Sequence, residues 1–494
     1  MSNGYYKNEQ LKEYFENYVS DLNVDERYHP ILVDILLRRA DLYDLSPEEI
    51  QQDVVSLVYN LEKIEIATMP ENHKNVAGVF FSEEKRIAIS KEYATEINSE
   101  KLYQILTHEV YHVLLYDENG EDRLEKYNIY TQKYNSTLLE AIVEKASYRA
   151  VFGNNKQDNI YFNNSANGYR DITFIVDAIE ATYGVSEQDF LKNALKGREE
   201  LAIFLANQVG EEPDKAYNFL DALEANYTLL HNTMYPDAGE EITSRKQIIS
   251  NIQNAMVGIY ELCEYKFYER IISKDLQSYE DAVNFNNELK YNHNKFTATM
   301  QDRLEYFNVE FSPSIRRTVY NSVDSRRIDT LSIINDFDSV IASAYNFRDE
   351  SEFLNVCKYA QCGQLESLDE QYLNEHGIER KFTYDLPINR EIVDKVFEGE
   401  TFENEYDNKS IGFLLDQIVK EDTKKKNLFQ RGFEKLRNMF IRNNQKLLNP
   451  PANDLNNRNA ASNWPEPLEN KNQEYNKIVA MKIERKSRRE DNER

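Results

Sequence analysis

The spacing of apolar residues in the first 60 positions predicts three amphipathic helices. Residues 6–22 and 26–43 carry apolar side chains at three- and four-residue spacing, so each places them on one helical face. Ser46, Pro47 and Glu49 then combine an N-cap residue, a proline in the first turn and a glutamate that can close a capping box. A third helix is therefore expected to begin here and to end near residue 61.

The period next changes from helical to alternating. Residues 63–67 alternate polar and apolar side chains, and residues 76–81 and 86–89 flank a polar tetrapeptide. This pattern predicts one strand followed by a hairpin. Such a hairpin either packs on helices alone or offers an edge strand that binds an extended peptide through its backbone.

Helical spacing returns at residue 99. We expect Ser99 to cap a helix that runs to about residue 116, because six apolar residues between 102 and 114 form one stripe. A second helix is expected from about Arg123, and a third over residues 136–150.

The rest of the chain has the same helical period. Four helices are expected between residues 170 and 300, over residues 171–183, 186–208, 213–231 and 244–272. More helix follows up to residue 420. The fold class that these elements predict is mainly α (α+β): a small sheet and the helix that follows it, and then large helical regions.

Five divisions of the chain follow from these patterns. Residues 1–154 are expected to form one domain that contains the N-terminal helices and the small sheet. Residues 155–300 form a helical domain, which either closes a cleft against the first domain or is an independent bundle, and residues 301–422 form a second helical region. Residues 423–448 form a basic amphipathic helix, and residues 449–494 form a flexible linker and a charged tail.

Charge narrows the range of partners. The 494 residues carry a formal charge of -27, which repels a phosphate backbone, so no nucleic-acid partner is expected. The basic residues of 424–448 alternate with apolar ones. This segment is suited to an anionic membrane surface, to a partner protein or to the acidic body of the chain itself.

Three cysteines and an N-terminus without an apolar stretch indicate a cytoplasmic protein. Cys357 and Cys362 are near each other in sequence, but no second pair of Cys or His lies close enough to complete a metal site. We expect them to be ordinary thiols.

The candidate chemistry lies in the helix that begins near residue 99. His108, Glu109 and His112 form an HExxH sequence. Two histidines four residues apart lie on one helical face, so both imidazoles can reach one cation. Glu109 lies where its carboxylate can act on a water molecule at that cation as a general base.

A third ligand must come from another carboxylate. Glu118 stands six residues after His112, but Leu115 occupies the midway position where metzincins have a turning glycine, so we prefer Glu140. Glu140 and Glu144 interrupt an apolar helical run. Buried carboxylates need a cation or hydrogen-bond donors; alternatively, the i,i+4 pair occupies one solvated face.

Residues 60–150 resemble the gluzincin metallopeptidases. The resemblance implies that Glu140 is the third ligand and that Glu144 accepts a hydrogen bond from the free nitrogen of His108. Leu139 departs from the family pattern, which often has Asn there, and Glu144 is longer than the usual Asp. The order of strand, hairpin and HExxH helix also resembles the small zincin domains of ImmA/IrrE-type regulatory peptidases, and the motif does not separate the two families.

These features predict a zinc-dependent metallopeptidase, a hydrolase that cleaves a peptide or protein substrate. Zn²⁺ would be held by His108, His112 and Glu140, with Glu109 as the general base. Tyr169 is one candidate for the oxyanion donor. The alternative is a non-catalytic structural or interaction protein that retains a zincin-like core, but such a protein needs no general base.

Overall fold

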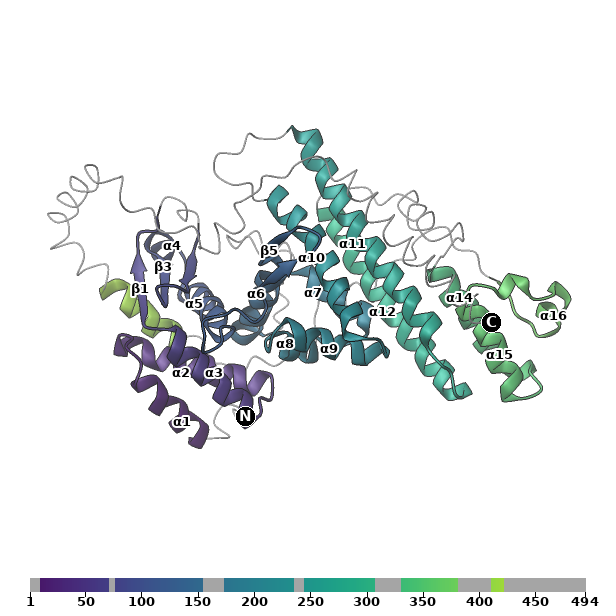
Figure 1. Ribbon diagram of the computed structural model, residues 1–494, viewed down its shortest axis with the longest axis horizontal. Coiled ribbons are helices and arrows are strands. Elements are labelled where there is room, and N and C mark those ends of the chain that lie inside the picture. The colour runs from purple at the N-terminus through teal and green to yellow at the C-terminus, as the bar shows by residue number, and fades with distance from the viewer. Residues whose placement is uncertain are drawn as a thin grey trace.

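A computed structural model describes residues 9–70, 76–153, 173–234, 244–306, 330–380 and 410–421 of the chain (Figure 1). The fold is mainly α with a small mixed sheet, as the sequence predicts. Tyr169 and the basic segment 424–448 lie outside the described residues. Within those residues, every helix is either too short or too polar to cross a membrane.

Three helices precede the sheet, close to the predicted positions. Ser46 accepts a hydrogen bond from the backbone N–H of Glu49, whose side chain accepts one in return from the N–H of Ser46, so the predicted capping box is confirmed. The helices are α1 Glu9–Ser20, α2 His29–Leu42 and α3 Pro47–Asn60, with a short 3₁₀ turn before α2.

The sheet has three strands in the order β1-β3-β2: β1 Lys63–Ala67, β2 Gly78–Phe81 and β3 Arg86–Ser90. β2 and β3 form the predicted antiparallel hairpin, and β1 pairs with β3 in parallel. Phe80, Ile87 and Ile89 join the main core below the sheet, whereas Val79 and Ala88 belong to a small second cluster. Among the described strands, β2 lies at one edge of the sheet, and its residues Gly78, Val79 and Phe80 are buried.

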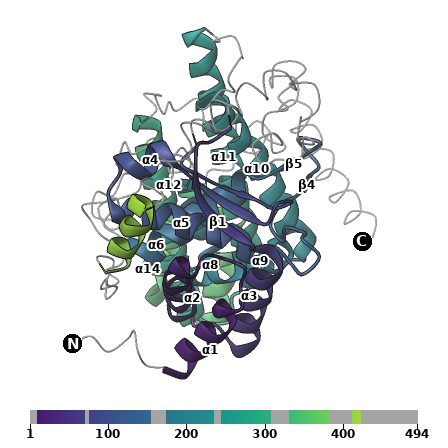
Figure 2. The same cartoon turned by 90° about the vertical axis from the view of Figure 1, so that its left-hand side faces the viewer.

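The helix that contains the HExxH motif, α5, spans Ser99–Leu114 and lies against the sheet (Figure 2). A short helix, α4 Lys91–Glu96, connects it to β3. The N-cap of α5 is Asn98, which accepts from the N–H of Lys101, so the prediction of Ser99 as the cap is wrong by one residue. An Asn side chain caps as well as Ser does, and only the local backbone decides between the neighbours.

The helix expected from Arg123 does not form. Residues Lys126–Asn128 and Lys133–Asn135 pair instead as the antiparallel strands β4 and β5. Each strand has only three residues, which is too short to show an alternating pattern in the sequence. The predicted helix over 136–150 follows as α6 Thr137–Phe152.

The second half of the described chain is helical. The single helix expected over 186–208 is divided in two, because Gly197 has a φ of +136°, which ends the helical backbone. The helices are α7 Phe174–Tyr183, α8 Glu187–Ala194, α9 Arg198–Val209, α10 Pro213–Met234, α11 Arg245–Ser273 and α12 Tyr279–Tyr306. The boundary predicted between residues 300 and 301 falls inside α12.

Further helices lie at opposite ends of the molecule. α14 Thr330–Ala342, α15 Glu350–Gln361 and α16 Glu370–Glu375 lie beyond α11 and α12, on the far side from the sheet (Figure 1). The helix over residues 410–421 lies back beside α2 and the sheet. One hydrophobic cluster runs from Phe15 to Val419, so the core is continuous across the described parts.

Candidate metal centre

Helix α5 presents His108 and His112 on one face because they are one turn apart. Its position is fixed by buried polar contacts. The hydroxyl of Tyr103 donates to Asp34 on α2 over 2.5 Å. At the other end, Arg123 Nη2 donates to the carbonyl oxygen of Leu114 over 2.7 Å, which satisfies an acceptor that the helix itself leaves open.

Helix α6 is fixed by a contact from α10. The N-cap of α6 forms no side-chain capping bond, and the carboxylate of Glu224 accepts a hydrogen bond from the N–H of Leu138 instead, over 3.1 Å. Arg198 holds Glu224 through a buried ion pair of 2.8 Å. This contact sets the first turn of α6, and Glu140 lies at its end.

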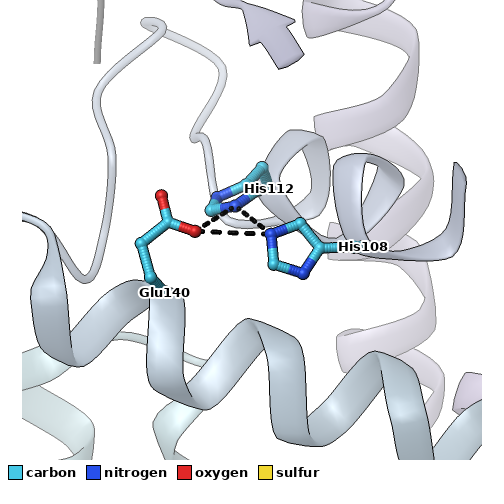
Figure 3. A group of neighbouring side chains, drawn as sticks. All are labelled: His108, His112 and Glu140. Atoms are coloured by element: carbon cyan, nitrogen blue, oxygen red, sulfur yellow. Dashed lines mark hydrogen bonds and ion pairs between the residues drawn. The ribbon is translucent and has the colours of Figure 1, made fainter. Parts of the chain in front are cut away.

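The two helices bring three ligand atoms together (Figure 3). His108 Nε2 lies 3.1 Å from His112 Nε2, and Glu140 Oε2 lies 3.3 Å from the first nitrogen and 3.2 Å from the second. All three side chains are at least 93% buried. The structure therefore brings the three predicted ligands into one compact triangle.

The dimensions of the triangle fit a tetrahedral metal. Ligand atoms bound at about 2.0–2.1 Å in tetrahedral geometry lie about 3.3 Å from one another. The three atom pairs span 3.1 to 3.3 Å. Two imidazoles and a carboxylate suit zinc, and three protein ligands leave a fourth position open.

The orientation of His108 is set by Glu144, which stands one turn after Glu140 on α6. Glu144 is fully buried and accepts a hydrogen bond from His108 Nδ1 over 3.0 Å, which leaves Nε2 directed at the other two ligands. The side chain of Gln104 donates to both oxygens of Glu144, over 3.2 and 3.1 Å. Sequence reasoning missed Gln104, although it precedes His108 by one turn on the same face of α5.

The charged groups of the cluster favour a cation at its centre. Burial alone would lower the pKa of His108, but its hydrogen bonds with Glu140 and Glu144 raise that pKa well above the ordinary value. Burial would raise the pKa of Glu140, but the charge of His112 and the hydrogen bond with His108 lower it strongly. The carboxylate of Glu140 is therefore ionised.

Glu109 lies on the neighbouring face of α5, beneath β2. Burial raises its pKa, against the charges of His108 and His112 and a hydrogen bond with the backbone of Phe80, which lower it. The carboxylate also approaches Gly78 closely: a Cβ atom at that position would lie 2.9 Å from Glu109 Oε1. Strand β2 thus runs directly over the predicted general base.

Glu118, the carboxylate that was set aside in favour of Glu140, lies outside the triangle. Glu118 is exposed and is not part of the cluster, although α5 ends at Leu114 and Leu115 is its C-cap, so that the chain turns without a glycine at this position. The chain does turn there, and the turn directs Glu118 into solvent. Tyr169 lies outside the described residues.

Asp122 is a further acidic residue close to the ligands. One of its oxygens accepts the N–H groups of Leu124 and Glu125, whereas Oδ2 is buried without a hydrogen-bond partner in the described parts of the chain. Burial raises its pKa, and the charge of His112 lowers it. The sequence pattern predicted that the helix ends here but did not single out Asp122, whose position depends on the turn after α5.

A second group of carboxylates, Asp177, Glu180 and Glu187, already surrounds a cation of the chain itself. The ammonium of Lys145 lies 2.8 Å from Asp177, 3.2 Å from Glu180 and 2.8 Å from Glu187. Lys145 directly follows Glu144, so this ion-pair network holds α6 against α7 and α8 while Glu144 faces α5. We assign it a structural role.

Comparison of the chain with protein-family models, with curated proteins and with solved structures finds no match.

Proposed function

We propose that this chain is a zinc-dependent metallopeptidase. The observation that supports it is the triangle of His108 Nε2, His112 Nε2 and Glu140 Oε2, whose sides of 3.1 to 3.3 Å match the ligand spacing of tetrahedral zinc. A structural zinc site usually closes its fourth position with another Cys or His. Among the described residues no such ligand adjoins the triangle. Glu109, an acid that can serve as a general base, does adjoin it.

Each residue of the site has a role in peptide hydrolysis. Zinc, when bound, supplies Lewis-acid activation of a water molecule. Glu109 accepts the proton of that water and delivers it to the leaving amine nitrogen, and the raised pKa of its buried carboxyl group suits both transfers. The free edge of β2 offers backbone N–H and C=O groups to an extended peptide.

Three variants of the full chain test the proposal. His108→Ala and Glu140→Gln each remove a ligand, so both are expected to lose bound zinc. Glu109→Gln keeps all three ligands, so it should retain zinc while kcat on unfolded casein falls about 10²- to 10⁴-fold. Zinc is measured by elemental analysis of the purified proteins, and hydrolysis by release of amino groups.

His376→Ala is the matched control, because His376 lies near α16 and outside the triangle. It should keep both zinc and activity. A wild-type chain that binds no zinc at micromolar supply would refute the metal site. A chain that binds zinc equally in the wild type and in Glu109→Gln, and cleaves nothing in either, would instead be the non-catalytic alternative.

A further inference from the structure

Helices α5 and α6 meet in a row of buried polar side chains that is longer than the metal triangle. Gln104, His108 and His112 lie one turn apart on α5, and Glu140 and Glu144 lie one turn apart on α6. All five residues are at most 5% exposed. Gln104 extends the row by one turn of α5 beyond the nearest ligand.

The contacts in this row alternate between the two helices. Glu140 lies between the histidines, with Oε2 3.3 Å from His108 Nε2 and 3.2 Å from His112 Nε2. Glu144 lies between His108 and Gln104. It accepts from His108 Nδ1 over 3.0 Å, and its two oxygens accept from Gln104 Nε2 over 3.2 and 3.1 Å. Two donors from neighbouring turns of α5 therefore hold one carboxylate of α6.

The amide of Gln104 turns its nitrogen toward Glu144, and an amide nitrogen donates hydrogen bonds but does not accept them. Both oxygens of Glu144 therefore act as acceptors toward Gln104, and His108 donates to the same carboxylate from Nδ1. A neutral histidine that carries its proton on Nδ1 keeps the lone pair of Nε2 for a metal. The direction of the hydrogen bonds in the row thus fits the role of His108 as a ligand.

We propose that Gln104 is a positioning residue of the zinc site, which acts through Glu144 on the orientation of His108. A carboxylate held by one donor can rotate about its bond to Cγ, whereas donors from two turns of α5 fix it. With Glu144 fixed, Nε2 of His108 points at the position of the metal. This inference rests on the zinc triangle of the proposed function, but it does not require peptide hydrolysis.

Two single substitutions in the full chain reverse one partner of the contact each. Gln104→Glu sets a carboxylate against the carboxylate of Glu144. Glu144→Gln sets an amide nitrogen against that of Gln104 when its oxygen accepts from His108. We expect each variant to bind zinc about 10- to 100-fold more weakly, as measured by competition with a chelator of known affinity.

The double variant Gln104→Glu/Glu144→Gln exchanges the two groups. The amide at position 144 can accept from His108 with its oxygen and donate to the carboxylate at position 104 with its nitrogen, so both contacts are satisfied again. We expect the double variant to bind zinc about tenfold more tightly than either single variant. If Gln104 only filled space, the two losses would add.

Gln104→Met provides a second test, because it has a side chain of similar length without the donor. We expect it to weaken zinc binding about tenfold. Gln51→Glu is the control, since Gln51 is exposed on α3 and undergoes the same chemical change as Gln104→Glu. It should leave the zinc affinity unchanged. Urea unfolding of the metal-free chains identifies any variant that does not fold, and Gln104→Met decides the question where the charged variants do not.

The outcomes separate this inference from the proposed function. If the wild type binds zinc and Gln104→Met binds it equally tightly, Gln104 has no positioning role and the zinc site stands. The same conclusion follows if a folded double variant binds zinc no better than the single variants. A wild-type chain that binds no zinc would overturn both proposals. Rescue of zinc binding in a chain that cleaves no peptide would support the role of Gln104 and remove only the peptidase function.

Discussion

At the scale of single residues, the site is a set of buried polar groups that satisfy one another only in part. His108 uses Nδ1 on Glu144, and Glu144 uses its two oxygens on His108 and Gln104. The Nε2 atoms of His108 and His112 and the carboxylate of Glu140 then face one another. Two imidazole nitrogens at 3.1 Å can share one proton at most, so a single cation satisfies this triangle better than hydrogen bonds do.

Glu144→Gln is the substitution that isolates this support. The new amide keeps one acceptor but turns an NH₂ group toward either His108 or Gln104, both of which donate in the native contact. One pair of donors must then face each other in the fully buried site. We expect zinc affinity to fall about 10- to 100-fold, as measured by competition with a chelator of known affinity.

The control for this variant is Glu13→Gln, at an exposed position of α1. It makes the same chemical change, and the zinc affinity of that variant should equal that of the wild type. Urea unfolding of both metal-free variants separates a loss of fold from a loss of metal affinity. An unchanged affinity in a folded Glu144→Gln variant would show that Glu144 does not orient His108.

At the scale of secondary-structure elements, the sequence predicted what depends on local spacing and failed where tertiary contacts decide. The i,i+4 spacing of His108 and His112, and that of Glu140 and Glu144, is local, so both pairs could be placed on helix faces in advance. The strands β4 and β5, in contrast, were predicted as helix.

The features that the sequence did not predict depend on contacts between secondary-structure elements. Gln104 meets Glu144 only because α5 and α6 pack together, and the first turn of α6 is fixed by Glu224 from α10, 84 positions after Glu140. No spacing in the sequence reports such pairs. The approach of β2 to α5 is another contact of this kind.

Gly78→Ala tests that approach. A Cβ atom at position 78 would lie 2.8 Å from Ile105 Cγ2 and 2.9 Å from Glu109 Oε1, so strand and helix must move apart or Glu109 must shift. A displacement of the general base by about 1 Å can lower kcat about 100-fold. We expect lost peptidase activity with retained zinc, because the three ligands lie outside this contact.

Gly210→Ala provides the comparison, since a Cβ there meets no atom within 4 Å although the backbone has a φ of +69°. That variant should lose about 1 kcal/mol of stability from backbone strain and keep full activity. Equal kcat values for Gly78→Ala and the wild type would mean that the contact between β2 and Glu109 does not matter for catalysis.

At the scale of the whole molecule, the chain returns from its far end to the metal-binding part. Helices α14 to α16 lie on the side remote from the sheet, whereas the helix over 410–421 lies beside α2 (Figure 1). Leu415 in this helix is fully buried, and Glu421 forms an ion pair of 3.3 Å with Arg27. Glu421 and its partner Arg27 are 394 positions apart in the sequence, so the position of this helix could not be inferred from the sequence pattern.

The returning helix passes close to Ser99, the first residue of α5, at Gly412. A Cβ atom on Gly412 would lie 2.9 Å from both Cβ and Oγ of Ser99. In isolation, Gly412→Ala favours the helix by about 1 kcal/mol, so any loss of protection must come from the packing contact. We expect faster amide hydrogen exchange over 410–421 in this variant, measured by mass spectrometry on the full chain.

Phe413→Ala, which removes a ring that is 59% exposed, should leave the exchange rates unchanged. If Gly412→Ala instead slowed exchange, helix propensity would outweigh the contact, and residues 410–421 would not depend on close packing against α5.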